Sequence, residues 1–466
     1  MSKTYQDYLE VGDSEELRMQ FVLQVINEYK SSDLYKYGLI AYDYARKKNR
    51  TIMQFQKLLY TMSGQVVPDN YSSNWKIRSS FFSRFVTQET QYLLGNGISW
   101  REDSTAGKLG GDFDTKLQKL GKNALIGGCA YGFWNYDHLE VFDIREFVPL
   151  YDEENGALRA GVRFWQLEAT KPLRATFYEE DGYTEYLWKD GKGTILKEKR
   201  SYIEKIRTSV ADGTEIYDFE NYPSFPIVPL WGNMNRQSEL EGLREGIDCY
   251  DLIKSGFAND LDDTSQIYWT IQNGGGMDDI DLAKFVERMK TVKAAVVEDS
   301  GARAEAHTID VPYNAREALL ERISADLYRD AMALDTKLIA GGAVTATQIR
   351  AAYEPLNSKT DEFEYCIHEF LDNMLAIAGI KNEKPTFTRS MMLNRSEEID
   401  SVLKAAQFLD ADYVTQKILT IQGDGDMADA MIEKMHADEL ERMSLITQAT
   451  PETEEEPTET EESVQE

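Results

Sequence analysis

Residues 225–276 read FPIVPLWGNMNRQSELEGLREGIDCYDLIKSGFANDLDDTSQIYWTIQNGGG, and they divide the chain into two structurally different parts. An extended segment containing Pro226 and Pro229 leads to Ser238, a residue type that favours helix N-caps. Apolar residues then recur at steps of three and four: Leu240, Leu243, Ile247, Tyr250, Ile253, Phe257 and Leu261. This spacing predicts one amphipathic helix over residues 238–266, roughly 40 Å long at ~1.5 Å per residue.

The chain before this helix predicts an α+β region over residues 1–237. Helical periodicity covers residues 13–48 and 72–94, and Gly95 closes the second of these segments. Polar and apolar residues alternate from Tyr131 to Tyr222, and the dipeptides Asp181-Gly182 and Asp190-Gly191 are hairpin signals. We expect an antiparallel sheet packed on the N-terminal helices.

The chain after it predicts a second long helix over residues 313–334. Residues 267–312 lie between the two helices and mix strand-like runs with a short helical one. Two long helices on either side of a short insertion pack most simply as an antiparallel pair. The overall fold class is therefore helix-rich α+β.

A glycine-containing loop over residues 335–348 follows the helix pair. Thr345 and Gln348 have the spacing of a capping box, which predicts a helix from there to Gly379. Pro355 should bend this helix because proline cannot donate a hydrogen bond to residue 351. Residues 380–449 predict further helices, and the acidic residues 450–466 predict disorder.

Composition limits the classes of function. Lys and Arg total 51 against 81 Asp and Glu, a formal charge of −30, which argues against a surface that grips DNA phosphates. Cys129, Cys249 and Cys366 are far apart and odd in number, which favours reduced thiols. The sequence has no apolar run of the ~18 residues that a membrane span needs and no apolar signal core, so we expect a soluble protein made in the cytoplasm.

Enzyme signatures are missing from the sequence. It has no G-x-x-x-x-G-K-[ST] loop, G-x-S-x-G elbow or H-E-x-x-H pair. Its four histidines offer few candidates for a zinc or acid–base site. We predict no catalytic residue, no metal site and no cofactor.

Two acidic clusters need an explanation. Asp424, Asp426 and Asp429 resemble the start of a calcium loop, but later ligand positions are not acidic, so helix capping by Asp426 is the favoured interpretation. Asp260, Asp262 and Asp263 fall near the end of a predicted helix, where negative charge is unfavourable. Nothing local in the sequence explains this second cluster.

The order of motifs resembles the portal proteins of tailed double-stranded DNA bacteriophages, of the long-tailed siphophage type. Four segments carry the main resemblance: Pro229-Leu230-Trp231-Gly232-Asn233, Ser238-Glu239-Leu240, Ile247-Asp248-Cys249-Tyr250-Asp251 and Phe257-Ala258-Asn259-Asp260-Leu261. Tyr92-Leu93-Leu94-Gly95 adds a fifth. Trp231-Gly232 and Cys249 depart from the usual pattern without breaking it, and the resemblance runs from about residue 30 to 440.

This resemblance implies a ring subunit with named parts. They are a wing (1–237), stem helix 1 (238–266), a clip (267–312), stem helix 2 (313–334), a tunnel loop (335–348), a kinked wing helix (349–379), a helical crown (380–449) and the acidic tail (450–466). Residues of the tunnel loop that would meet DNA are Lys337, Leu338, Ile339, Ala340, Gly341, Gly342, Ala343 and Val344. Thr345, Gln348 and Pro355 would form its hinge, and Asp260, Asp262 and Asp263 are candidates for an acidic channel lining.

The implied function is a cyclic channel of twelve copies at one capsid vertex, through which double-stranded DNA is packaged and ejected. Implied partners are the terminase large subunit, a head–tail connector or adaptor, and the major capsid and scaffold proteins, with no membrane. The location would be the virion, after assembly in the host cytoplasm. Two alternatives remain open: a metal-dependent nuclease that uses the aspartate clusters, and a head–tail adaptor ring without DNA contact.

Overall fold

A computed structural model describes residues 3–60, 65–69, 72–208, 215–264, 268–272, 303–307, 313–340, 345–390 and 395–449. The chain forms two compact units, Met1–Asp335 with Tyr353–Ser390, and Thr336–Ala352 with Met391–Glu466. The first unit therefore closes only when residues from two distant parts of the sequence come together.

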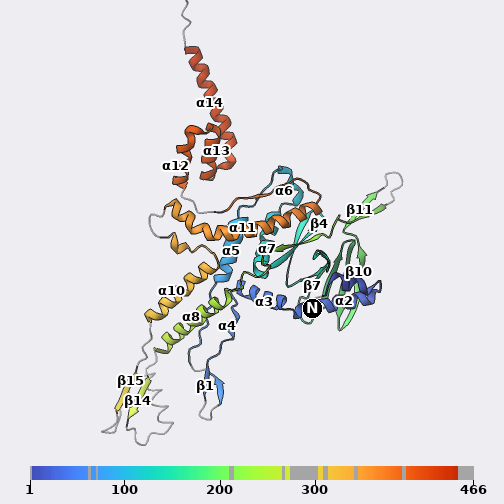
Figure 1. The fold of residues 1–466 in the computed structure, drawn as a ribbon, viewed down its shortest axis with the longest axis vertical. Helices are drawn as coiled ribbons and strands as arrows, with labels where there is room; N and C mark the ends of the chain where they lie inside the picture. The colour runs from blue at the N-terminus through green and yellow to red at the C-terminus, as the bar shows by residue number, and fades with distance from the viewer. Residues whose placement is uncertain are drawn as a thin grey trace, which may run out of the picture. The chain divides into compact units, whose positions relative to one another are not determined.

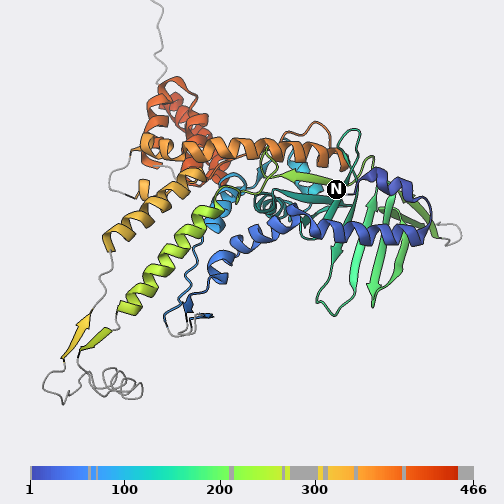
Figure 2. The same ribbon diagram turned by 60° about the horizontal axis from the view of Figure 1, so that its bottom comes forward.

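A five-stranded antiparallel sheet forms one end of the first unit (Figures 1 and 2). Its order is β10 (Lys192–Arg200), β9 (Gly182–Lys189), β8 (Leu173–Glu179), β7 (Leu158–Trp165) and β6 (Phe147–Tyr151). Helices α1 (Tyr5–Val11) and α2 (Glu15–Ser31) bury their apolar side chains against it. Both predicted hairpins are confirmed, and Asp190 and Gly191 both have positive φ, as a tight two-residue turn requires.

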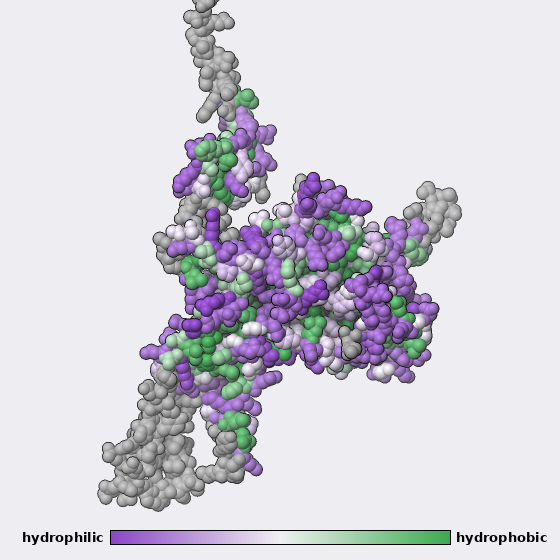
Figure 3. All heavy atoms as spheres, in the orientation of Figure 1, coloured by the Kyte–Doolittle hydropathy of each residue, from purple (hydrophilic) through white to green (hydrophobic). Residues whose placement is uncertain are grey.

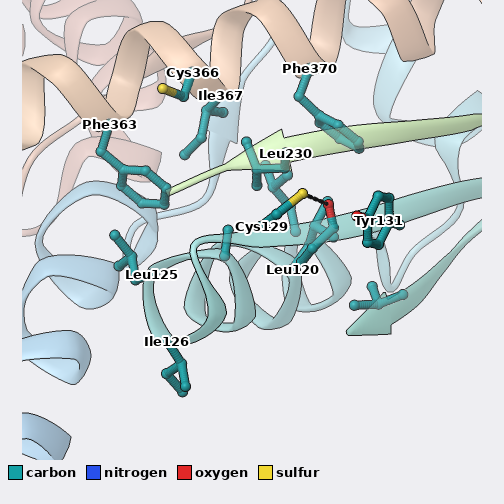
Figure 4. Close-up of a cluster of buried hydrophobic side chains, with 14 of the residues drawn as sticks. Leu120, Leu125, Ile126, Cys129, Tyr131, Leu230, Phe363, Cys366, Ile367 and Phe370 are labelled. Atoms are coloured by element: carbon teal, nitrogen blue, oxygen red, sulfur yellow. Dashed lines mark hydrogen bonds between the residues drawn. The ribbon is translucent and has the colours of Figure 1, made fainter. Parts of the chain in front are cut away.

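A second, three-stranded sheet holds the largest core. It runs in the order β13 (Ile227–Trp231), β4 (Cys129–Asn135) and β5 (His138–Asp143), with α3 (Asp33–Ala45), α5 (Phe81–Leu94) and α7 (Phe113–Gly127) in the same core. Figure 4 shows Cys129 and Leu230 of this sheet facing Phe363 and Ile367 of α11 (Ala346–Ile377). A Cβ on Gly132 would lie 2.6 Å from the Phe370 ring, so only glycine lets α11 pack this closely.

Several short elements complete the first unit. They are α4 (Arg50–Gln54), α6 (Asp103–Leu109), and the antiparallel pairs β1 (Leu58–Tyr60) with β2 (Val66–Pro68), β3 (Ile98–Ser99) with β16 (Thr386–Phe387), β11 (Ile203–Thr208) with β12 (Glu215–Glu220), and β14 (Tyr268–Gln272) with β15 (Arg303–His307). Strand β14 confirms the strand-like run before the glycines. The predicted helix and the other predicted strands within residues 273–312 lie outside the described residues, except for His307, which is the last residue of β15.

The second unit is helical where it is described. It contains η1 (Thr336–Leu338), the beginning of α11, α12 (Arg395–Ala405), η2 (Ala406–Phe408), α13 (Ala411–Gln422), η3 (Gly425–Met427) and α14 (Ala428–Ala449). The helices predicted after Met392 are confirmed. Residues 380–390 belong instead to the first unit, where β16 pairs with β3. The predicted disorder of residues 450–466 lies outside the described part of the chain.

The helix predicted over residues 238–266 begins later than expected. Helix α8 covers Arg244–Thr264, because Gly242 adopts a φ of +77° that interrupts the helical backbone. Ser238 caps no helix: its Oγ donates to the Ile126 carbonyl at 2.6 Å and accepts from the Leu240 N–H. Helix α10 covers Tyr313–Asp330 and ends before residue 334, since Met332 has a φ of +50°.

The helix predicted over residues 72–94 also begins later, at Phe81. Residues 72–80 are extended instead, and side chains of α8 bind their backbone. The Ser79 N–H donates to Asp251 Oδ1 at 2.8 Å, and the Ile77 N–H donates to Ser255 Oγ at 2.9 Å. The Trp75 N–H donates to Asn259 Oδ1 at 2.6 Å, and the Asn259 amide donates back to the Trp75 carbonyl at 3.3 Å.

The spacing of these bonds follows from the two backbones. Asp251, Ser255 and Asn259 are four residues apart in a helix, an advance of ~6 Å, while two residues of extended chain advance ~6.6 Å. The three side chains are 0%, 1% and 3% exposed. Since a buried polar group without a partner is costly, the buried polar face of α8 and the segment 72–80 require one another. We refer to these contacts as the α8 polar ladder.

A buried charge cluster joins four further parts of the first unit. The Lys359 ammonium of α11 lies 2.8 Å from a carboxylate oxygen of Glu89 in α5 and 2.6 Å from one of Glu239 before α8. It also donates to the Ala331 carbonyl after α10 at 3.3 Å. Burial lowers the pKa of Lys359, but the two carboxylates outweigh it and raise the pKa above its ordinary value, whereas burial raises the pKa of Glu89 to about 7.

We expect Asp251→Ala to destabilise the protein by about 1–3 kcal/mol, because one N–H of the buried Asn49 amide and the backbone N–H of half-buried Ser79 then lose their acceptor. It should also speed tryptic cleavage after Lys76 and Arg78, since the extended segment loses one of its attachments. Urea unfolding and timed digestion measure the two effects. Glu245→Ala, an exposed change on the same helix, is the matched control and should do neither.

We expect Lys359→Met to destabilise the protein by about 3–5 kcal/mol at about pH 8, because the buried carboxylate of Glu89 and the half-buried one of Glu239 then face each other without a cation. The unfolded-state pKa of a glutamate is ~4.3 and that of folded Glu89 is about 7, so the folded state binds more protons between these values. The loss in the free energy of unfolding should therefore be smaller at about pH 5, where Glu89 is protonated in the folded state. Urea unfolding at both values tests this, and adding Glu89→Gln should recover stability at the higher pH; an equal loss at both would contradict it.

Candidate functional site

The loop between α10 and α11 is described in part. Lys337 and Leu338 lie in the single turn η1, closed by a 3.3 Å bond from the Ile339 N–H to the Thr336 carbonyl. Lys337 is exposed, and Leu338 is 70% exposed although it is a large apolar residue. Ile339 is half-buried and Ala340 exposed. Gly341, Gly342, Ala343 and Val344 lie outside the described residues.

The start of α11 has the predicted capping box. The Thr345 N–H donates to Gln348 Oε1 at 3.0 Å, and the Gln348 N–H donates to Thr345 Oγ1 at 3.3 Å. These reciprocal bonds satisfy backbone groups that a helix end otherwise leaves free. The boundary between loop and helix is thus sharply defined at Thr345.

The rest of α11 contrasts with its exposed start. Pro355 lies inside the helix on its exposed side. Ala351 is exposed too, and its carbonyl receives no helical hydrogen bond because Pro355 has no N–H. Water can reach that carbonyl. From Leu356 onward the helix is anchored by buried residues: Leu356, Phe363, Ile367, Phe370, Leu371 and Met374. A bend at Pro355 stays a prediction.

The acidic residues near the end of α8 do have partners within the chain. Asp260 pairs with Arg316 of α10. Asp262 accepts from the Ser73 hydroxyl and, at 3.3 Å, from the Trp75 indole N–H. The side chain of Asp263 lies outside what the structure describes. Asp260 therefore joins the two long helices, and Asp262 continues the α8 polar ladder.

The residues that organise this region were missed from the sequence. The apolar periodicity drew attention to Tyr250, Ile253 and Phe257, which are only half-buried. The signal that could have found the ladder is the second period on the same helix, the polar residues Asp248, Asp251, Ser255 and Asn259. Lys359 gives no such signal, because a lone lysine in a helix is ordinarily exposed.

The acidic cluster of Asp424, Asp426 and Asp429 lies in the second unit, at the start of α14. Asp424 precedes the turn η3, Asp429 falls in the first turn of α14 as predicted, and the side chain of Asp426 is outside the described set. Among the described residues, no three His, Cys, Asp or Glu side chains are grouped so that they could hold a metal ion. No described helix is long and apolar enough to span a membrane.

Comparison with known proteins gives consistent results. The family described as "Phage portal protein, SPP1 Gp6-like" matches residues 27–444. The portal protein of Clostridium phage phiCD119 is 28% identical over 376 residues, which are 71% of this chain and 78% of that protein. The portal protein of Bacillus phage SPP1 is 26% identical over 392 residues, 77% of this chain and 74% of that one.

Among solved structures, a chain in the virion of a native gene transfer agent particle aligns with a TM-score of 0.41 at 12% identity, over 73% of this chain and 89% of that one. This structural similarity is too weak to support a conclusion about the function of the chain. The family match, by contrast, includes the α8 polar ladder, the loop, the capping box and Lys359. The chain belongs to the SPP1 Gp6-like family of phage portal proteins.

Proposed function

We propose that copies of this chain close into a ring, twelve in the assembled state, that forms the channel for double-stranded DNA at one capsid vertex. The observation that carries the proposal is the family match over residues 27–444. The ring would sit in the virion after assembly in the host cytoplasm. Its partners would be the terminase large subunit, a head–tail connector, and the major capsid and scaffold proteins.

The subunit would act mechanically and without catalysis, and the ATPase that drives packaging would be the separate terminase. Helices α8 and α10 would form the stem, β14 and β15 part of the clip, and α12 to α14 the crown. The α8 polar ladder and the Lys359 cluster support this assignment, because both fix the helix pair to the wing through buried polar bonds. A stem that surrounds moving DNA has to stay fixed relative to the wing.

The loop over Lys337 to Val344 would be the moving part that meets DNA. Leu338 supports this, since a large apolar side chain that its own subunit leaves 70% exposed is available for contact. The capping box at Thr345 and Gln348 would mark the hinge, and Pro355 would permit a bend between that hinge and the anchored part of α11.

The formal charge of −30 suits a channel through which DNA must pass without being bound tightly. A lining that neutralised ~6–10 phosphates would bind DNA tightly, whereas carboxylates repel the DNA backbone. Asp260, Asp262 and Asp263 remain candidates for this lining. Asp260 and Asp262 would then serve twice, since their second role is to hold α10 and the segment 72–80.

Light scattering and class-averaged electron microscopy of the purified full chain test the ring directly. We expect annular particles of about 640 kDa, which is twelve times 53.3 kDa, or of a neighbouring subunit number. A protein that stays dimeric and cuts DNA when metal is added would overturn the proposal in favour of the nuclease.

Replacing Gly341 and Gly342 together by leucine should impair DNA packaging while rings still form, because bulky side chains would crowd a loop that repeats around the channel. Packaged DNA per capsid, measured by nuclease protection, is the readout. Gly107→Ala is the control, because a Cβ at that position meets open space, and it should leave packaging unchanged. Normal packaging by the leucine variant would count against the loop.

A further inference from the structure

The antiparallel pair of β1 and β2 forms an arm, defined as residues 53–60 and 65–69, that leaves large apolar side chains uncovered. Leu58 is 58% exposed and Val66 is 52% exposed, and Met53, Phe55 and the neighbouring Trp75 are exposed as well. Figure 3 shows apolar surface over this arm. An isolated two-stranded hairpin is marginally stable in water, so an arm of this composition needs a partner surface.

The arm also lies in the most basic part of an acidic chain. Residues 46–80 contain a single acidic residue, Asp69, in a protein whose formal charge is −30. They contain seven basic ones: Arg46, Lys47, Lys48, Arg50, Lys57, Lys76 and Arg78. The Lys76 ammonium is held at the arm by a 2.8 Å bond to the Met53 carbonyl. A partner with exposed carboxylates beside apolar side chains would suit this surface.

The outer surface of α10 has that composition. Tyr313 is 48% exposed, and Glu317 and Glu321, which follow it at steps of four and so lie on the same side of the helix, are exposed as well. Within the described residues these two glutamates have no ion pair. The arginines of α10 are already engaged: Arg316 with Asp260, and Arg322 and Arg329 with Asp326.

The two surfaces lie on opposite sides of α8. One side of α8 holds the segment 72–80 through the polar ladder, and another side packs on α10, where Phe257 meets the Tyr313 ring at 5.7 Å. Both ribbon views place α8 between α10 and the chain leading to β1 (Figures 1 and 2). A head-to-tail ring needs two different complementary surfaces on opposite sides of each subunit.

We propose that the arm of one copy docks on the outer surface of α10 of the next copy, with Lys57 and Lys76 facing Glu317 and Glu321 and the apolar residues packed between them. The inference rests on the proposed ring and names the contact that would close it. DNA is a weaker candidate for the arm, because phosphate contacts use cations and leave the apolar side chains without a function.

Charge reversal tests the contact in the full chain. An arm variant carries Lys57→Glu and Lys76→Glu, and a helix variant carries Glu317→Lys and Glu321→Lys. Each alone should lower the fraction of protein in rings by roughly tenfold or more, since like charges then face one another at every contact. Native mass spectrometry measures that fraction, and Lys171→Glu with Lys192→Glu, at exposed sites elsewhere, should leave it unchanged.

Mixing the two variants is the decisive step. The acidic arm of one then meets the basic helix of the other, and the remaining contact is the natural one, so rings should return with an even number of alternating subunits. This recovery also shows that each variant is folded. Rings at the natural level from either variant alone would overturn the inference, as would folded variants that fail to assemble when mixed.

Two further results separate the possible failures. An arm variant that forms rings normally but retains less double-stranded DNA would assign the arm to DNA and overturn the contact with α10. An unmodified chain that forms no ring at all would overturn the proposed function itself. Rings from the unmodified chain that are indifferent to both charge reversals would remove only the arm contact.

Discussion

The buried polar face of α8 is the constraint on which the rest of the first unit depends. A helix that buries Asp251, Ser255 and Asn259 has to supply each with a partner, and the extended segment 72–80 does so with its own unpaired backbone groups. Without the other element, the buried polar groups of either one would have no hydrogen-bond partner. The pairing fixes the entry into α5 on one side and the position of α8, and through it α10, on the other.

The Lys359 cluster complements this pairing at the other end of the helix pair. One ammonium contacts carboxylates before α8 and in α5 and a carbonyl after α10, so four segments meet at a single charge. A buried ion pair contributes less to stability than apolar packing of equal volume, but it specifies which groups must meet. The ladder and the cluster thus fix the geometry of the long helices, while the apolar core that includes Phe370 stabilises the unit by removing nonpolar surface from water.

The local sequence pattern predicted the fold class, the antiparallel sheet, the hairpin at Asp190-Gly191 and the capping box at Thr345, because each depends on residues close together in the chain. It placed the starts of two helices wrongly. The positive φ of Gly242 and the extended form of residues 72–80 depend on distant partners, which a local pattern does not contain. The candidate site followed the same division: its capping box was predictable from Thr345 and Gln348, whereas the ion pair of Asp260 required knowledge of Arg316. Tertiary contacts decide such positions over local preference.

The α8 polar ladder also sets a condition on when the protein can fold. The acceptors for the N–H groups of Ser79 and Trp75 are 172 and 184 residues further along the chain. Glu383, which accepts from the Thr105 hydroxyl, is 278 residues further along. During synthesis the basic arm region therefore emerges long before the helix that holds it in place. Contacts so distant in sequence form slowly, and an incomplete chain exposes the surfaces they will cover. A chain that ends before α8 lacks the acceptors for the N–H groups of Trp75, Ile77 and Ser79, so nothing in such a chain makes these bonds to the segment 72–80.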